Sequence, residues 1–179
     1  MKTVYLLRHA KAERGRPAAA DSERALDERG QGAAALVGHA MAARGWIPET
    51  ALVSGAKRAL QTFEILATHL GPDLTVRVEP GLYLVEADVL IARLRRLRAD
   101  IGAVLLVGHN PGLQEAALAL AGSADPDASG RIAETFPTAA LVRLAFAVET
   151  WRDIGPGTVR SIELVTPKML RKHEGGRDS

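Results

Sequence analysis

Residues 103–110, with the sequence AVLLVGHN, contain the most continuous apolar run in the chain. A short unbroken run of aliphatic residues is typical of a strand that is buried on both faces of a parallel sheet. The residues that follow, 112–121, are expected to form a helix. This stretch therefore predicts one strand–helix unit, which is the repeating element of an α/β fold.

Strand–helix alternation extends through most of the chain on both sides of this unit. The other predicted strands are residues 4–7, 51–53, 74–78, 140–148 and 159–165, and the other predicted helices are residues 27–45, 55–71 and 88–99. Polar residues, glycine and proline predict loops at residues 11–26 and 122–138, and the last two strands are expected to pair antiparallel. This order favours a single-domain, three-layer α/β/α fold with a mostly parallel central sheet.

The composition excludes several classes of function. The 179 residues include no cysteine, which excludes a disulfide framework, a zinc site with thiolate ligands and a cysteine nucleophile. There are 23 basic and 21 acidic residues, a balance too even for a protein dedicated to nucleic-acid binding. A nucleic-acid partner is therefore not expected.

The amino terminus and the distribution of apolar residues bear on localisation. The first apolar run is too short for a signal peptide, and two basic residues, Arg8 and His9, follow it directly. Nowhere do about 18 apolar residues follow one another, which is the length that a membrane span needs. The sequence predicts a cytoplasmic protein without a membrane partner.

Polar side chains follow three of the predicted strands at the point where each strand ends. Arg8 and His9 follow the first strand, Ser54 and then Arg58 follow the second, and His109 follows the strand at 103–107. Ligands of open α/β sheets bind beyond the carboxyl ends of the strands. We therefore expect the two histidines and two arginines to lie together, although they are far apart in the sequence.

These residue types suit the chemistry of phosphate. Arg8 and Arg58 carry planar guanidinium groups that match phosphate oxygens and stay charged. A neutral histidine nitrogen is a competent nucleophile for phosphorus, and cationic neighbours disfavour the protonation of His9. His109, once protonated by a bound dianion, would donate to the phosphoryl oxygens. Ser54 remains open as either a helix cap or a phosphate contact.

Three motifs carry a resemblance to a known family. Residues 7–11 (LRHAK), 54–62 (SGAKRALQT) and 107–112 (VGHNPG) resemble the signatures of the histidine phosphatase, or phosphoglycerate-mutase-like, superfamily. Further matches at residues 24–30, 81–83, 136–138 and 166–168 resemble its small SixA-type branch of phosphohistidine phosphatases. The resemblance covers residues 1–170, which we expect to form the histidine phosphatase domain, with 171–179 as a polar tail.

The resemblance implies a phosphatase that works without a metal or other cofactor. His9 would be the nucleophile that becomes phosphorylated, Arg8 and Arg58 would clamp the phosphoryl group, and His109 would stabilise it. Lys11, on the loop after the nucleophile, and Asn110 are expected as additional substrate contacts, together with Ser54. The implied substrate is phosphohistidine in a protein; the alternatives are a small phosphorylated metabolite, or a phosphate-binding regulatory module without turnover.

Two features leave alternatives open. Larger members of the family carry a glutamate that protonates the leaving oxygen, and no carboxylate aligns with it here, because Glu86 and Asp88 lie slightly downstream. An absent acid would favour phosphohistidine, whose imidazole can leave already protonated. The basic segment at residues 93–98 is either a solvated helix face or a docking surface for an acidic partner protein.

Overall fold

The computed structural model describes residues 1–175, and the side chains of residues 1–172. Its sheet has six strands in the order β3-β2-β4-β1-β5-β6. Their bounds are Lys2–Arg8 (β1), Thr50–Ser54 (β2), Thr75–Glu79 (β3), Ala103–Gly108 (β4), Leu141–Phe146 (β5) and Val159–Val165 (β6). Strand β5 is antiparallel to both of its neighbours, and the other pairs are parallel, so the sheet is mostly parallel as expected.

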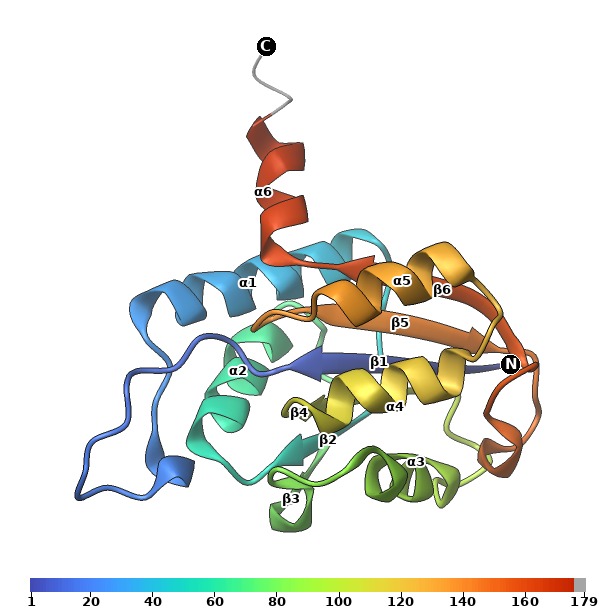
Figure 1. The fold of residues 1–179 in the computed structure, drawn as a ribbon, viewed down its shortest axis with the longest axis horizontal. Helices are drawn as coiled ribbons and strands as arrows, with labels where there is room; N and C mark the ends of the chain where they lie inside the picture. The colour runs from blue at the N-terminus through green and yellow to red at the C-terminus, as the bar shows by residue number, and fades with distance from the viewer. Residues whose placement is uncertain (176–179) are drawn as a thin grey trace.

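Helices cover both faces of the sheet (Figure 1). One layer holds α1 (Glu28–Ala43), α2 (Lys57–Ala67) and α6 (Pro167–Gly175), and the other holds α3 (Ala87–Arg95), α4 (Gly112–Ala121) and α5 (Pro126–Glu134). Short 3₁₀ turns lie at Asp21–Glu23 (η1), Pro80–Leu82 (η2) and Trp151–Asp153 (η3). The arrangement is the predicted three-layer α/β/α fold.

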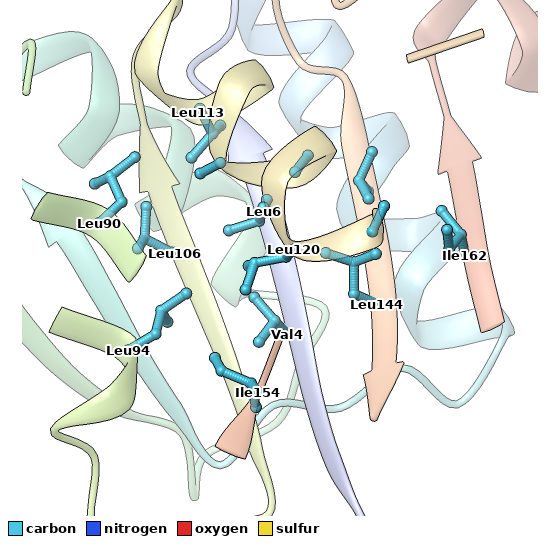
Figure 2. Packing of buried hydrophobic residues seen from close by; sticks show 14 of the residues in the cluster. Val4, Leu6, Leu90, Leu94, Leu106, Leu113, Leu120, Leu144, Ile154 and Ile162 are labelled. Atoms are coloured by element: carbon cyan, nitrogen blue, oxygen red, sulfur yellow. The ribbon is translucent and has the colours of Figure 1, made fainter. Parts of the chain in front are cut away.

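The two hydrophobic cores follow from the period-two alternation of side chains along each strand. In β1, Val4 and Leu6 join the cluster under α3, α4 and α5, whereas Tyr5 and Leu7 join the cluster under α1 and α2. Figure 2 shows Val4 and Leu6 beside Leu120 of α4 in the first cluster. A central strand that is buried on both faces needs apolar residues at every position, which is why the runs in β1 and β4 are unbroken.

The region 122–138, which the sequence predicts as a loop, contains α5, so that prediction is wrong in part. Pro126 fits the first turn of a helix, and the Asp125 side chain caps the turn by accepting the Ala128 N–H at 2.9 Å. Ala128 and Ile132 are fully buried in the core under α4. With only these two buried side chains, the helix has too short an apolar stripe to stand out among Gly, Asp and Ser.

The carboxyl-terminal end of the described chain is helical. Helix α6 continues through residue 171 to Gly175 and extends away from the body of the molecule (Figure 1). The rest of the predicted polar tail, residues 176–179, lies outside the described residues. The domain boundary at residue 170 stays a prediction. Across residues 1–175, the helices are too short or too polar to cross a membrane.

Candidate active site

The carboxyl ends of β1 and β4 lie side by side because the two strands pair in parallel, with Arg8 opposite Gly108. The next residue of each strand is a histidine, and the imidazole rings of His9 and His109 have their centroids 5.2 Å apart. The His9 backbone N–H donates to the Gly108 carbonyl at 3.0 Å, which continues the strand pairing into the site. Two residues that are far apart in the sequence therefore face each other at one sheet edge.

Two hydrogen bonds fix the ring nitrogens of His9. Its Nδ1 lies 2.7 Å from the carbonyl oxygen of Ala10, which only accepts, so Nδ1 carries the ring proton. Its Nε2 then has a free lone pair, which accepts from Nε of Arg58 at 3.2 Å. His9 is therefore held as a neutral imidazole with Nε2 as the basic nitrogen.

The surroundings of His9 favour this neutral form. The pKa of His9 is lowered from 6.5 to about 4, mainly by burial; the Ala10 hydrogen bond opposes this shift, and the positive charges of Arg58, Arg8 and Arg24 contribute to it. At neutral pH the Nε2 lone pair is consequently available for attack on phosphorus.

Arg8 and Arg58 approach the histidines from two different elements. Arg8 ends β1, and its Nη1 donates to the Phe136 carbonyl at 2.8 Å, while its buried Nε has no hydrogen-bond partner among the described residues. Arg58 lies in the first turn of α2, and its side chain is only 4% exposed. Both guanidinium groups are held in place by contacts within the protein and carry N–H groups suited to oxyanions.

Ser54 lies behind His109 and is fully buried. Its Oγ is 2.7 Å from Nε2 of His109 and also accepts, at 3.4 Å, the N–H of Ala56. The Ser54 hydroxyl can donate to His109 Nε2, and in that arrangement the ring proton lies on Nδ1. Helix α2 has Ala56, not Ser54, as its N-cap, so the reading of Ser54 as a helix cap is wrong.

The other nitrogen of His109, Nδ1, is buried and has no hydrogen-bond partner among the described residues. The pKa of His109 is lowered from 6.5 to about 3, mainly by burial, with smaller contributions from the neighbouring His9 and Arg58. Without a bound anion, His109 is therefore neutral, and when Ser54 donates to its Nε2, the Nδ1–H is a donor without an acceptor. Such a group is suited to an incoming oxyanion.

Asp21 is a site residue that the sequence analysis did not find. It lies in η1, inside the segment predicted as a loop, and its Oδ2 accepts from Nη2 of Arg58 at 3.0 Å and from the Tyr83 hydroxyl. The Tyr83 ring in turn packs edge-on against His109, with centroids 5.3 Å apart. The contact between Asp21 and Tyr83 joins residues that are 62 positions apart, so no local sequence pattern predicts it.

Two of the predicted substrate contacts bind groups of the protein itself. Lys11 is half exposed, and its Nζ lies 3.7 Å from a carboxylate oxygen of Asp27. Asn110 donates from Nδ2 to Gln114 at 3.1 Å and to the Phe136 carbonyl at 3.3 Å. Because the Phe136 carbonyl also accepts from Arg8, Asn110 is linked to the site through that shared oxygen.

The two downstream carboxylates, Glu86 and Asp88, lie at the start of helix α3. Glu86 is the N-cap residue of α3, and the Asp88 carboxylate accepts the N–H of Val89 at 2.8 Å. Both residues are exposed, and neither forms a hydrogen bond with His9, His109 or either arginine within the described part of the chain. Within residues 1–172, the His, Asp and Glu side chains form no cluster of three or more that could hold a metal ion.

The basic segment at residues 93–98 is largely engaged within the chain. The contacts are Arg93 with Glu79 at 2.6 Å, Arg95 with the Ile154 carbonyl at 2.9 Å, and Arg98 with Asp100 at 2.7 Å. These contacts occupy three of the four guanidinium groups. They favour a structural and solvated face over a docking surface.

Comparisons with known proteins agree with this geometry. Residues 4–88 match the family model of the histidine phosphatase superfamily (branch 1). An uncharacterized protein of Mycobacterium leprae is 35% identical over 169 residues, which are 89% of this chain and 96% of that protein.

Two solved structures resemble the fold along nearly the whole chain. A candidate phosphohistidine phosphatase SixA from Agrobacterium tumefaciens is 26% identical, with a TM-score of 0.79 over 93% of this chain and 98% of that one. A protein histidine phosphatase SixA complexed with tungstate is 25% identical, with a TM-score of 0.76 over 94% and 99% of the two chains. The similarity therefore extends well beyond the residues that the family model matches.

Proposed function

This chain belongs to the histidine phosphatase superfamily, in its SixA-type branch, and is a phosphatase; we propose that its substrate is phosphohistidine in a protein and that His9 is the nucleophile. The observation that carries the role of His9 is the pair of hydrogen bonds that puts the ring proton on Nδ1 and leaves the Nε2 lone pair facing Arg58. One similar solved structure is of a protein histidine phosphatase and the other is of a candidate phosphohistidine phosphatase, which supports the substrate class.

The first step is attack of His9 Nε2 on the phosphorus of the substrate. The bond from phosphorus to the substrate nitrogen breaks, and its electron pair stays with that imidazole. A phosphohistidine ring that already carries a proton on its other nitrogen leaves as neutral imidazole, so this step requires no proton from the protein. Among the described residues, Glu86 and Asp88 form no hydrogen bond with either histidine or with Arg8 or Arg58, in keeping with a reaction that uses no carboxylic acid.

In the second step water attacks the phosphorus on His9, and the P–N bond to His9 breaks. The oxygen and both hydrogens of the water leave on the phosphate, and Nε2 regains its lone pair. Arg8 and Arg58 neutralise the phosphoryl oxygens in both steps, and the Nδ1–H of His109 donates to one of them. Ser54 and Asn110 act as positioning residues, because their contacts are with His109 and with the carbonyl that holds Arg8.

A basic groove beside the site supports a protein-sized substrate. It has a volume of about 380 Å³, and its charged lining residues are Lys11, Arg29, Lys168 and Arg171. The lining also includes Thr135 and Pro137, the two neighbours of Phe136, whose carbonyl holds Arg8. The groove therefore begins next to Arg8, and its charge suits acidic side chains around a phosphohistidine. Lys11 would make its substrate contact here.

The test of the substrate class is a parallel measurement of kcat/KM on a histidine-phosphorylated protein and on 3-phosphoglycerate. We expect the phosphoprotein to be preferred by at least about a hundredfold, because the ester needs a proton donor that general acid catalysis normally supplies. The His9→Ala protein provides the background rate, since phosphohistidine also hydrolyses without an enzyme. Comparable values for the two substrates would contradict the substrate class, and no turnover of either would point to a binding module.

The protonation state of His9 gives a second expectation. A titration of the free protein followed by NMR should show His9 protonating at about pH 4, so that the nucleophile is lost only below that pH. Arg58→Gln should raise this pKa, but leave it below 6.5, because burial is the larger cause of the shift. Titration of His9 near 6.5 in the wild type would show that the imidazole is solvated.

The same shift has a consequence for stability. The unfolded chain binds a proton at His9 below about pH 6.5, whereas the folded chain does so only below about pH 4. The unfolded state therefore binds more protons in that window, and the free energy of unfolding should fall as the pH is lowered through it. Urea titrations at several pH values measure this slope, which His9→Asn should reduce.

A further inference from the structure

Asp21 holds the outer side of Arg58 with both its backbone and its side chain. Its carbonyl accepts from Nη1 of Arg58 at 2.8 Å, and its Oδ2 accepts from Nη2 at 3.0 Å. Its other carboxylate oxygen accepts from Nη1 of Arg24 at 3.0 Å, and the Tyr83 hydroxyl completes the set. Arg58 itself donates to the nucleophile His9, so this carboxylate is two hydrogen bonds away from the attacking nitrogen.

The Asp21 carboxylate is a fixed negative charge. Hydrogen bonds from Tyr83 first, and then from Arg24 and Arg58, hold the pKa of Asp21 well below its usual range. An ionised carboxylate accepts hydrogen bonds and has no proton to give, so Asp21 is unsuited to protonate a leaving group. Its influence on the reaction is therefore electrostatic.

Asp21 also marks the open end of the site. Its side chain is 48% exposed, whereas the Arg58 side chain beside it is 4% exposed. The exposed carboxylate is joined through Arg58 to the nucleophilic nitrogen of His9, so a leaving group that departs toward solvent on this side would pass a negative charge. A leaving group with its own negative charge would be repelled there, and a neutral imidazole would not.

We infer that Asp21 is a specificity-determining residue, which disfavours phosphoryl substrates whose leaving group is anionic. The inference rests on the proposed function, in that it places the phosphoryl group on His9 with Arg58 as one of its ligands. It narrows the substrate class to phosphoryl groups on uncharged leaving groups, to which the imidazole of phosphohistidine belongs. Sugar acids and nucleotides that carry further negative charge next to the phosphate would be poor substrates.

The test compares 3-carbamoylphenyl phosphate with 3-carboxyphenyl phosphate, which have nearly the same shape and differ in the charge of one substituent. We expect the wild type to prefer the neutral compound by about tenfold in kcat/KM, since like charges at this range repel at the reduced effective dielectric of a protein surface. Asp21→Asn should reduce the preference to about twofold, mainly through a lower KM for the charged compound. The ratio cancels any loss that affects both substrates equally.

The control variant is Glu23→Gln, which removes the other, exposed carboxylate of η1 and should keep the wild-type preference. An equal preference in the wild type and in Asp21→Asn would overturn the inference. These aryl phosphates do not involve phosphohistidine. If the charge preference is found but phosphohistidine is not hydrolysed, the proposed substrate fails while the inference on Asp21 stands.

A binding measurement separates the effect of charge from the positioning of Arg58. Calorimetry with tungstate should show that Asp21→Asn binds this oxyanion at least as tightly as the wild type, because a nearby negative charge has been removed while an oxygen acceptor for Arg58 remains. Binding that is tenfold weaker would mean that Asp21 acts only by positioning Arg58, and would overturn its role in specificity.

Discussion

Replacing His9 with alanine is expected to lower kcat by about 10⁴-fold or more, because removal of a covalent nucleophile leaves only the contribution of substrate binding. The reason lies in the geometry of one nitrogen. The Ala10 carbonyl fixes the proton on Nδ1, and burial with three nearby arginines keeps Nε2 unprotonated at neutral pH. No other imidazole nitrogen of the described site has this combination, since His109 is bound to Ser54 through its Nε2.

The measurement is the rate of phosphate release from a histidine-phosphorylated protein, together with a search for a phosphorylated enzyme. A rapid quench of the wild type should trap an acid-labile, base-stable phosphoryl group on His9, which the His9→Ala protein lacks. His39→Ala is the matched control, because His39 lies exposed on α1 and its ring contacts His69 rather than the site. A wild-type rate in the His9→Ala protein would refute the two-step mechanism.

Replacing Arg58 with alanine is expected to lower kcat/KM by about 10³-fold, a loss typical of removing a donor that stabilises the charge of the transition state. Arg58 is nearly inaccessible to solvent and uses its fork to bind both His9 and Asp21. Its loss therefore removes a phosphate ligand and also leaves the Asp21 carboxylate without its closest buried cation. Tungstate affinity should fall in parallel with kcat/KM.

Arg58→Lys separates charge from shape. Lysine restores the positive charge but not the planar fork. The kcat/KM of Arg58→Lys should therefore exceed that of Arg58→Ala by less than about tenfold. Arg96→Ala is the control for the removal of one arginine, because Arg96 is the C-cap residue of α3 and is exposed. An Arg58→Ala protein within threefold of the wild type would show that Arg58 is not part of the phosphate site.

The sequence predicted the architecture well because its signals are local and strong. Helix α4 and strand β6 have the predicted bounds, and helix α1 begins after the predicted cap, since Asp27 accepts the Gly30 N–H at 2.7 Å. Where the apolar pattern is weak the prediction was less accurate. Helix α5 lies in a segment that the sequence predicts as a loop, and α3 ends at Arg95 rather than at residue 99.

Part of the candidate site also followed from the sequence. The prediction that polar residues after parallel strands gather at one sheet edge needed only the end of each strand, and the structure brings His9, His109 and Arg58 together there. Their catalytic roles stay predictions until the substitutions above are made. The sequences of β1 and β4 do not predict that these two strands are neighbours, because both are equally apolar.

The amino-acid sequence by itself determined the layers, the strands and the three motifs, since these depend on periodicity and on residues adjacent in the chain. Only the tertiary structure decided which ring nitrogen of each histidine is free, because that depends on the oxygens that meet them: Ala10 and Ser54. It alone also brought Asp21 and Tyr83 to Arg58. Hydrogen bonds and charges act over a few ångströms, whatever the distance along the chain, so contacts of this kind exist only once the chain has folded.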